Sequence, residues 1–362
     1  MGVRQLIDKP VDRSKEADEE IRAILEKRRT QIKVIGCGGA GNNTVTRLMQ
    51  IGIVGAETIA INTDAADLLY TDSNKKVLIG KELTGGLGAG ADPKIGMEAA
   101  RESKEDIKKV LQGADMVFLT CGMGGGTGTG SIPVVGEIAK KLGALTVAIV
   151  TLPFSMEGKQ RMNNAREGIE NLETVVDTLI VIPNDKLLEI VPDVSLLTAF
   201  KVADEILVNA VKGIAELVTK PGLVNVDFAD VRAVMNQGGL AMIGMGESDT
   251  ENRAFEAVEK ALNNPLISVD INEAKGALIN VSGGPDITIR EAQQIVEGVS
   301  SKISDDAKVI WGATIDKSLG DSVRALLIVT GVKSPQIFGP EKSWTKEEKK
   351  NVQKSLGIEF IE

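Results

Sequence analysis

The residues of this chain that point most directly to chemistry are the seven from Gly124 to Gly130, which read Gly-Gly-Gly-Thr-Gly-Thr-Gly. They follow an apolar run that ends at Cys121 and precede a helix-like stretch that begins near Ser131. A glycine-rich turn at a helix start can direct several backbone N–H groups at one anion, where the helix dipole is also positive. No Lys-Ser or Lys-Thr pair follows, so this is not the loop of P-loop NTPases. The heptad predicts a phosphate site whose counter-charge comes from elsewhere.

Two further glycine-rich loops precede helix-like segments, at 36–43 and 85–93. The first matches Gly-x-Gly-x-x-Gly, which alone would indicate a dinucleotide site with Asp64 as the acid that binds the ribose. The second ends in Asp92-Pro93, which a simple helix cap and first turn would also explain. A dinucleotide site needs one such loop, whereas three converging loops suit a triphosphate.

The composition excludes several kinds of site. The 362 residues include no histidine, which removes Ser-His and Cys-His nucleophile pairs and His-ligated metals. Catalysis must therefore use carboxylates, cations or the backbone, and no residue is assigned as a metal ligand. A net charge of −9 and an aromatic content of 3% argue against nucleic acid as a partner.

Cys37 and Cys121 each end an apolar run just before a glycine loop. We interpret both as small buried residues of two matching strand–loop units, with a redox pair as the alternative. Two thiols, no secretory signal and no apolar run of about 20 residues predict a soluble cytoplasmic protein without a membrane span.

Strand-like and helix-like segments alternate from Gln31 onward. Strands are predicted at 32–35, 58–61, 77–79, 116–120, 146–152 and 178–182, and helices at 44–49, 93–111 and 132–142. This order predicts an α/β fold with a Rossmann-like, mostly parallel sheet that carries helices on both faces.

A long apolar stretch at 195–219, closed by Pro221 and Gly222, predicts a central helix of roughly 36 Å between two domains. Beyond it, helices at 228–235, 252–262 and 289–302 and strands at 240–245, 276–281, 308–314 and 322–330 predict a smaller α/β domain. The predicted division is an N-terminal extension helix at 1–30, a nucleotide-binding domain at 31–194, the central helix at 195–220, a C-terminal domain at 221–332 and a tail at 333–362.

Four segments, at 39–43, 124–130, 156–161 and 222–230, together resemble the FtsZ cell-division GTPases, which are relatives of tubulin. The similarity runs from about Gln31 to Gly331, and the archaeal members look most similar. The resemblance implies the tubulin/FtsZ fold, with a C-terminal domain that activates the GTPase and takes part in assembly. It also implies binding of GTP and GDP with Mg²⁺, GTP hydrolysis, and a homopolymeric filament of the division ring at mid-cell.

The resemblance also implies roles for individual residues. The phosphates would bind two loops, made of Gly38, Gly39, Ala40, Gly41, Asn42 and Asn43 and of Gly124, Gly125, Gly126, Thr127, Gly128 and Thr129. Glu157 would bind the ribose with Arg161 on the same helix face, Asn184 and Asp204 would read guanine, and Phe200 would stack on the base. A carboxylate suits guanine because it can accept from both N1–H and the 2-amino group.

Three residues beyond the central helix are implied to be catalytic: Asn225, Asp227 and Asp230. Helix rise places them about 25 to 35 Å from the guanine residues, too far to reach the same nucleotide. In the family this loop enters the next subunit's site, where its carboxylates orient the attacking water. Such a head-to-tail contact repeats without closing and gives filaments. Taken alone, Asp227 and Asp230 could equally be a helix cap.

Two alternatives remain open at this point. One is an NAD-dependent dehydrogenase that uses the loop at 36–41, and the other is a tubulin-like scaffold that binds GTP without hydrolysing it. The apolar end of the tail, 356–361, is either a frayed terminus or a docking peptide for a membrane-anchor adaptor and division proteins.

Overall fold

The computed structural model describes residues 30–186, 196–220, 222–236, 239–264, 271 and 274–332. The predicted extension at 1–30, apart from its last residue, and the predicted tail at 333–362 lie outside the described residues.

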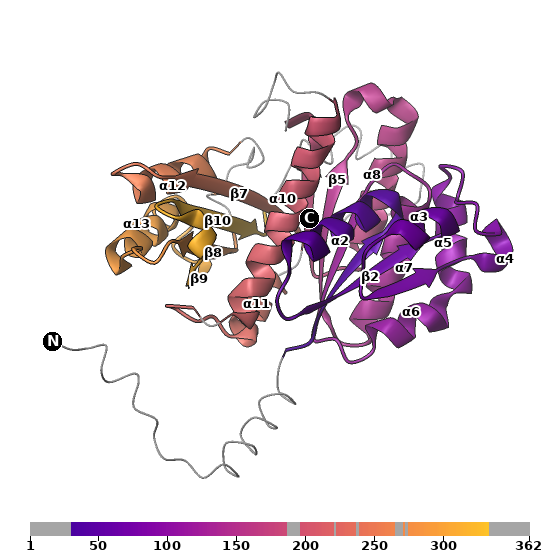
Figure 1. The fold of residues 1–362 in the computed structure, drawn as a ribbon, viewed down its shortest axis with the longest axis horizontal. Coiled ribbons are helices and arrows are strands. Elements are labelled where there is room, and N and C mark those ends of the chain that lie inside the picture. Colours follow the sequence, from indigo (N-terminus) through magenta and orange to yellow (C-terminus); the bar gives the residue numbers. More distant parts are fainter. Residues whose placement is uncertain are drawn as a thin grey trace, which may run out of the picture.

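The first half of the chain alternates strands with helices and forms one side of the molecule, as Figure 1 shows. Its strands are β1 (Ile32–Cys37), β2 (Ala56–Asn62), β3 (Lys75–Leu78), β4 (Met116–Gly122), β5 (Leu145–Leu152) and β6 (Thr178–Pro183). Its helices are α2 (Gly38–Ile51), α3 (Ala65–Tyr70), α4 (Lys81–Thr84), α5 (Pro93–Glu102), α6 (Lys104–Leu111), α7 (Thr127–Lys141), the short η2 (Ser155–Glu157) and α8 (Lys159–Glu173).

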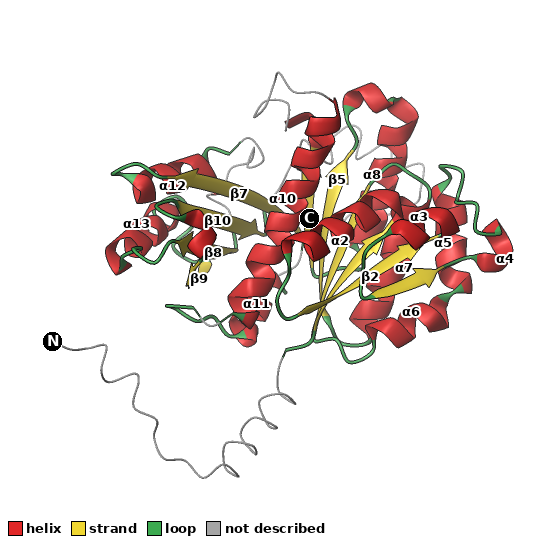
Figure 2. Cartoon of the chain, in the orientation of Figure 1, coloured by secondary structure: helices red, strands yellow, loops and turns green. Residues whose placement is uncertain are grey.

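The long helix α10 (Leu196–Thr219) runs between this half and a smaller second one (Figure 2). The second half contains helices α11 (Phe228–Met235), α12 (Arg253–Leu262), α13 (Ile289–Ser300) and η4 (Lys317–Leu319). Its strands are β7 (Leu240–Ser248), β8 (Gly276–Gly283), β9 (Lys308–Ile315) and β10 (Val323–Thr330). The predicted central helix is therefore present, with nearly the predicted bounds.

The described strands form one ten-stranded sheet in the order β3-β2-β1-β4-β5-β6-β7-β10-β8-β9. All strand pairs from β3 to β7 are parallel, and β10 pairs antiparallel with both β7 and β8. The two halves of the sheet meet where β6 and β7 pair through Leu179–Leu240 and Ile180–Ala241. The predicted two-domain α/β fold with a mostly parallel sheet is confirmed.

Both faces of the sheet are buried, which explains why its strands read as continuous apolar runs. Successive residues of β1 alternate between two cores, with Val34 in one and Ile35 in the other. The core that contains Val34 also contains side chains of α2, α10 and α11, and the other contains side chains of α5 to α8, α12 and α13. Helix α10 is buried along most of its length between the two halves, as its broad apolar face predicts.

Several helix boundaries differ from the predictions. Helices α2 and α7 begin at Gly38 and Thr127, so the later residues of the two glycine loops form the first turns of these helices. Glycine has a low helix propensity, which hid these turns from a periodicity argument. The predicted helix at 93–111 is two helices separated at Ser103, whose hydroxyl accepts a hydrogen bond from Gly80 N. Helix α8 was not predicted beyond the helix face assigned to Glu157 and Arg161, because it buries only a narrow set of small and apolar residues.

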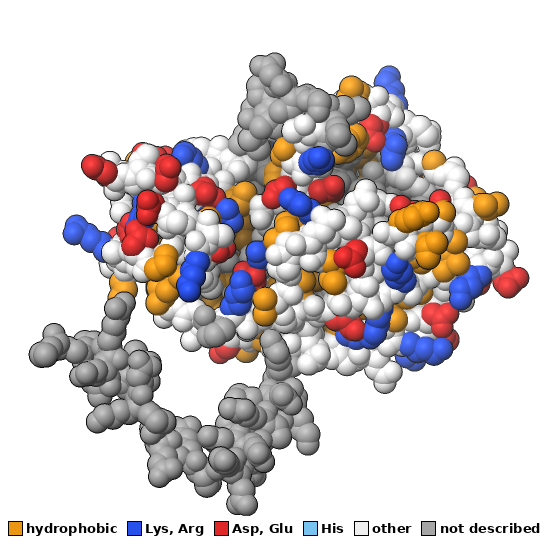
Figure 3. All heavy atoms as spheres, in the orientation of Figure 1, with side chains coloured by type: hydrophobic (Ala, Val, Ile, Leu, Met, Phe, Trp, Pro, Cys, Tyr) orange, Lys and Arg blue, Asp and Glu red, His pale blue; other side chains and the backbone are white. Residues whose placement is uncertain are grey.

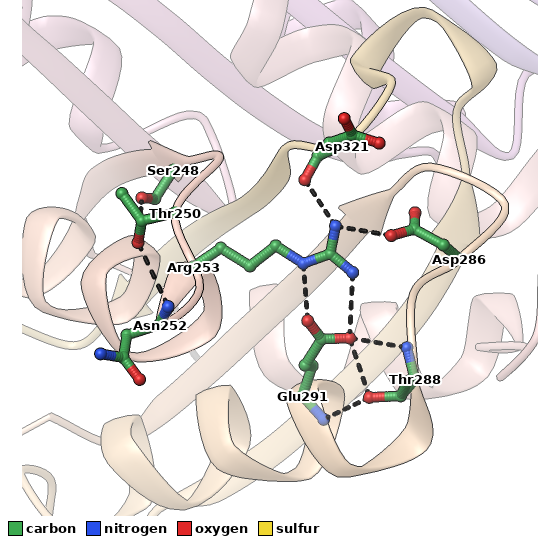
Figure 4. Close-up of polar contacts among 8 residues, drawn as sticks. All are labelled: Ser248, Thr250, Asn252, Arg253, Asp286, Thr288, Glu291 and Asp321. Atoms are coloured by element: carbon green, nitrogen blue, oxygen red, sulfur yellow. Dashed lines mark hydrogen bonds and ion pairs between the residues drawn. The ribbon is translucent and has the colours of Figure 1, made fainter.

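One arginine joins four segments at the outer end of the second half (Figure 4). Arg253 Nε donates to Glu291 Oε1 at 2.6 Å, and its Nη1 lies 2.8 Å from Asp286 Oδ2 and donates to Asp321 O at 2.5 Å. Its hydrogen bond with Glu291 raises the pKa of Arg253 and lowers that of the glutamate. This cluster fixes α12 and α13 and the turns that follow β8 and β9.

Candidate functional site

The first turns of α2 and α7 meet at the carboxyl ends of the neighbouring strands β1 and β4. Neither helix has a capping side chain at its N-terminus, so the first backbone N–H groups need partners from outside the helix. The approach is close: a Cβ on Gly38 would lie 2.8 Å from Gly128 N. Two uncapped helix starts directed at one place are suited to bind several phosphate oxygens.

The heptad is held in shape by its own residues and by α8. Gly124 N donates to Thr129 Oγ1 at 2.8 Å, and Thr129 is buried. Gly124 has φ of 102° and packs so tightly on α8 that a Cβ would lie 2.7 Å from Arg161 Cγ. Of the two threonines, Thr129 therefore shapes the loop, whereas Thr127 lies nearer the surface with its Oγ1 2.6 Å from Thr63 Oγ1.

The third glycine loop lies against the heptad. A Cβ on Gly126 would lie 2.8 Å from Asp92 N, and one on Gly96 would lie 2.3 Å from Gly126 O. Asp92 also caps α5, where its side chain accepts from Lys94 N at 2.9 Å. The capped helix predicted here is present, and the same segment packs the three loops together.

The acid assigned to the ribose in the dinucleotide alternative has a structural role. Asp64 Oδ1 accepts from Ala66 N at 2.9 Å and from Asp67 N at 3.0 Å, which makes Asp64 the N-cap of α3. The need for a helix cap therefore accounts for an aspartate at this position, and no dinucleotide is required to explain it.

A cavity of about 360 Å³ opens between the part of α2 beyond its first turn and the first half of α10, and Asn43 and Asp204 both line it. Burial raises the pKa of Asp204 to about 6, although the nearby Arg47 lowers it. Asn184 is 4% exposed, and its Oδ1 accepts no hydrogen bond within the described part of the chain. Asp204 at this cavity suits a polar ligand with N–H donors, such as guanine, whereas the residues that line the cavity do not include Asn184.

Phe200 projects from the first half of α10 and remains 39% exposed. Its ring contacts Phe154 edge to face, with centroids 5.3 Å apart. An aromatic ring fixed on one side and exposed on the other can stack on a base.

Glu157 and Arg161 form an ion pair, with Nη1 and Oε2 separated by 3.2 Å. The prediction that both lie on one helix face is wrong: Glu157 ends η2, Arg161 belongs to α8, and Gly158 between them has φ of 99°. The second carboxylate oxygen of Glu157 accepts from Phe154 N at 2.8 Å. Both residues still lie beside the heptad, because Arg161 packs on Gly124.

The predicted catalytic residues lie past the other end of α10. The helix cap is real, since Asp227 Oδ1 accepts from Asp230 N at 2.8 Å at the start of α11. Asn225 Oδ1 accepts from Gly222 N at 2.7 Å, and Val224 pairs with Ala313 of β9. The part of α10 from Asp204 to Thr219 is roughly 22 Å long by helix rise, and it separates this loop from the nucleotide residues. The structure therefore does not bring the two groups together within one chain.

Cys37 and Cys121 are free and buried. Burial raises the pKa of Cys37 to about 12 and raises that of Cys121 well above its usual value. A thiol that stays protonated is a poor nucleophile, so the interpretation as small core residues is favoured over the redox pair. Within the described residues, no helix is long and apolar enough to cross a membrane.

Mg²⁺ prefers carboxylate, amide and phosphate oxygens and often takes only one or two protein ligands beside substrate phosphates. The described residues contain no group of three or more acidic, cysteine or histidine side chains that could hold a metal alone. Two suitable oxygens do lie at the first phosphate loop: the Asp67 carboxylate and the buried Asn42 Oδ1, which accepts no hydrogen bond from the described residues. The donors present therefore fit a cation that arrives with a nucleotide.

Comparison with protein families matches residues 31–192 to the GTPase domain of the tubulin/FtsZ family and residues 239–333 to the C-terminal domain of the FtsZ family. The chain is 64% identical over 317 residues to cell division protein FtsZ 1 of Methanocaldococcus jannaschii, which covers 88% of this chain and 87% of the relative. It is 62% identical over 324 residues to that of Thermococcus kodakarensis, covering 90% and 87%.

A solved structure of an FtsZ dimer from M. jannaschii superposes with a TM-score of 0.84 and 63% identity, covering 87% of this chain and 92% of that one. The chain belongs to the FtsZ family and is a GTPase of that family. The dehydrogenase alternative is not favoured, because its single supporting loop is part of this GTPase domain.

Several residues of the site were not predicted from the sequence. Asp67, Thr63 and Arg47 reach it from α3, from the turn after β2 and from α2. The only available signal was the polar turn Asn62-Thr63-Asp64 directly after a buried strand.

Proposed function

We propose that this chain binds GTP at the convergent starts of α2 and α7 and polymerises head to tail as the cytoskeletal filament of the division ring. The observation that carries the proposal is the separation of two half-sites along α10. One end holds the phosphate loops and guanine cavity, and the other holds Asn225, Asp227 and Asp230. The FtsZ dimer known for the M. jannaschii relative supports self-association.

In the proposed reaction, Asp230 of one subunit orients and deprotonates the water that attacks the terminal phosphate bound by its neighbour. Asp227 holds the start of α11 through its hydrogen bond to Asp230 N and so positions that carboxylate. The N–H groups of the two helix starts bind phosphate oxygens. A bound Mg²⁺, held by Asp67 and Asn42 at the first loop, would supply positive charge to the phosphates.

The exposed apolar residues support a heterologous contact. Figure 3 shows hydrophobic side chains at the surface over α3, where Leu69 and Tyr70 are 72% and 86% exposed. At the other end of α10, Leu223 in the catalytic loop is 56% exposed and Ile315 at the end of β9 is 46% exposed. Two different apolar surfaces, one on α3 and one at the catalytic loop, are suited to join successive copies in a row.

The variant Asp230→Ala tests the shared site. Apart from its backbone N–H, Asp230 makes none of the hydrogen bonds or ion pairs found among the described residues. The substitution should therefore leave folding and GTP binding unchanged while lowering turnover about 100-fold or more. Undiminished turnover would refute the catalytic role and would leave hydrolysis to another group. Turnover that is absent even in the unmodified protein would instead favour the scaffold alternative.

A mixing experiment separates a shared site from a site within one chain. Asp204→Ala should impair guanine binding but leaves the catalytic loop intact, whereas Asp230→Ala does the reverse. Each variant alone should be inactive, and their mixture should regain activity, because Asp230→Ala subunits bind GTP that an Asp204→Ala neighbour hydrolyses. Asp230→Ala mixed with the double variant is the control and should stay inactive.

We further propose that the filament forms in the cytoplasm at the mid-cell division site and reaches the membrane through an adaptor. The proposed docking peptide for this adaptor, at 356–361, lies outside the described residues and stays a prediction from the sequence.

A further inference from the structure

A carboxylate on α3 lies against the first phosphate loop. Asp67 Oδ2 would be 3.8 Å from a Cβ on Gly39, which is exposed at the uncapped start of α2. The same oxygen accepts from Asn42 Nδ2 at 3.2 Å and from Asn62 Nδ2 at 2.6 Å. An ionised carboxylate can accept hydrogen bonds but cannot donate them. Both asparagines therefore turn their amide nitrogens, and not their oxygens, toward Asp67.

These bonds connect Asp67 to the second phosphate loop as well. Asn62 Oδ1 accepts from Thr63 N at 2.9 Å and from Asp64 N at 3.2 Å, which shapes the turn after β2. Thr63 Oγ1 then lies 2.6 Å from Thr127 Oγ1 in the first turn of α7. A single side chain thus supports both helix starts at which phosphate is expected.

The charge of Asp67 is not balanced by a protein cation. Among the described residues no lysine or arginine forms an ion pair with it, and Arg161 beside the heptad is paired with Glu157. The heptad itself contains no lysine. A bound nucleotide would therefore bring its phosphates next to an uncompensated negative charge, and the repulsion grows as the separation and the local dielectric fall.

We propose that Asp67 makes nucleotide binding by this chain depend on a divalent cation, which relieves the repulsion by binding both the phosphates and this carboxylate. The inference rests on the proposed function and extends it to the role of one residue. Asp67 then acts in two ways: it positions Asn42 and Asn62, and it disfavours nucleotide that arrives without its metal ion. An oxygen-only set of donors fits Mg²⁺.

The test compares nucleotide affinity with and without metal. Asp67→Asn retains an oxygen that can accept from the neighbouring amides but removes the charge. Asp72→Asn, just beyond the other end of α3, is the matched control because it removes the same charge from a side chain that makes none of the hydrogen bonds or ion pairs found among the described residues. The dissociation constants of GDP and of a non-hydrolysable GTP analogue are measured in excess Mg²⁺ and in EDTA at equal ionic strength.

For the unmodified protein and Asp72→Asn, affinity should fall strongly in EDTA. For Asp67→Asn, the ratio of the two dissociation constants should be smaller by about three- to tenfold, and the change should be larger for the triphosphate than for GDP. Asp67→Glu restores a charge and should restore much of the ratio. Asp67→Gln provides a second neutral variant for the same comparison if Asp67→Asn does not fold.

An equal change of both dissociation constants in the neutral variants would overturn the inference, because it would show a purely structural role. An unchanged ratio would overturn it as well. These results differ from a failure of the proposed function, in which the unmodified protein would bind no guanine nucleotide in Mg²⁺.

Discussion

Asp204 is the residue at which the chemistry of base recognition can be tested most directly. Burial raises its pKa to about 6, and Arg47 only partly offsets this. An ionised carboxylate accepts from guanine N1–H and the 2-amino group, whereas the protonated form must donate one hydrogen. Nucleotide binding therefore selects the ionised form of Asp204. The affinity for the nucleotide falls at low pH, where this carboxyl group is protonated.

We predict that GDP affinity is nearly constant above pH 7 and falls about tenfold per pH unit well below pH 6, because binding then requires loss of a proton. Binding isotherms at several pH values measure this. The effect on folding has the opposite sign: a carboxylate whose pKa is raised on folding stabilises the fold most below its unfolded pKa of 3.8, and this contribution is lost as the pH rises through about 6.

The variant Asp204→Asn should remove the pH dependence and change the preferred base. Its amide can donate where guanine also donates, but xanthine has a carbonyl oxygen in place of the 2-amino group. The affinity for xanthosine diphosphate relative to that for GDP should therefore rise by tenfold or more, since a mismatched buried polar group costs about 1 to 3 kcal/mol. Equal loss of both nucleotides would show that Asp204 does not contact the base.

The sequence pattern alone predicted that phosphate binds where the glycine loops converge, but not which residues read the base. Phosphate binding at a helix start depends on local backbone, so it leaves a local signal in the glycines. Asn184 directly follows β6 and Asp204 lies in α10, so the two are far apart in the sequence, and only the resemblance connected them. Asp67 left no signal because its role depends on the tertiary contact between α3 and α2.

At the scale of elements, the contact between α5 and α7 holds the heptad in place. Gly130 lies in α7 where it crosses α5, and a Cβ there would be 2.0 Å from Pro93 O and 2.6 Å from Met97 N. Backbone atoms cannot yield as a flexible side chain can. Two helices this close require glycine at the crossing.

We predict that Gly130→Ala lowers the free energy of unfolding by about 1 to 3 kcal/mol through overpacking, even though alanine favours a helix by about 1 kcal/mol. Gly125→Ala is the matched control: it introduces the same methyl group where nothing lies within 4 Å, and the change should stay within about 0.5 kcal/mol. Thermal or urea unfolding without nucleotide compares the two. Equal stability of both variants would show that α5 and α7 can separate at no cost.

The element order was predicted well, and the helix starts were not. Strands buried on both faces show up as apolar runs and helices as periodic ones, so most of the described strands and helices lie close to their predicted ranges. The first turns of α2 and α7 contain glycines that no local preference would make helical. They are helical because they pack against each other, with Gly38 against Gly128, and a tertiary contact of this kind cannot be read from spacing.

At the scale of the whole molecule, the proposal requires that one end of α10 complete the site at the other end of the next subunit. The phosphate loops have no lysine, and the catalytic loop has no nucleotide of its own. GTPase activity per subunit should therefore depend on protein concentration, rising steeply at an assembly threshold that light scattering detects with GTP but not with GDP.

Ile289 tests whether the subunit contact extends beyond the apolar surfaces on α3 and at the catalytic loop. It begins α13 and is 82% exposed, in the part of the second half that follows the end of β8. If it is buried between subunits, Ile289→Glu loses about 1.5 to 3 kcal/mol of apolar burial and adds a desolvated charge. The assembly threshold should then rise by tenfold or more, while GDP binding by the monomer stays unchanged.

Phe255→Glu on α12, where the ring is 53% exposed, is the control, because it also replaces an exposed apolar side chain with a carboxylate. An unchanged threshold for Ile289→Glu would place the subunit contact elsewhere. Loss of GDP binding in the same variant would mean that the two ends of the molecule are coupled within one chain.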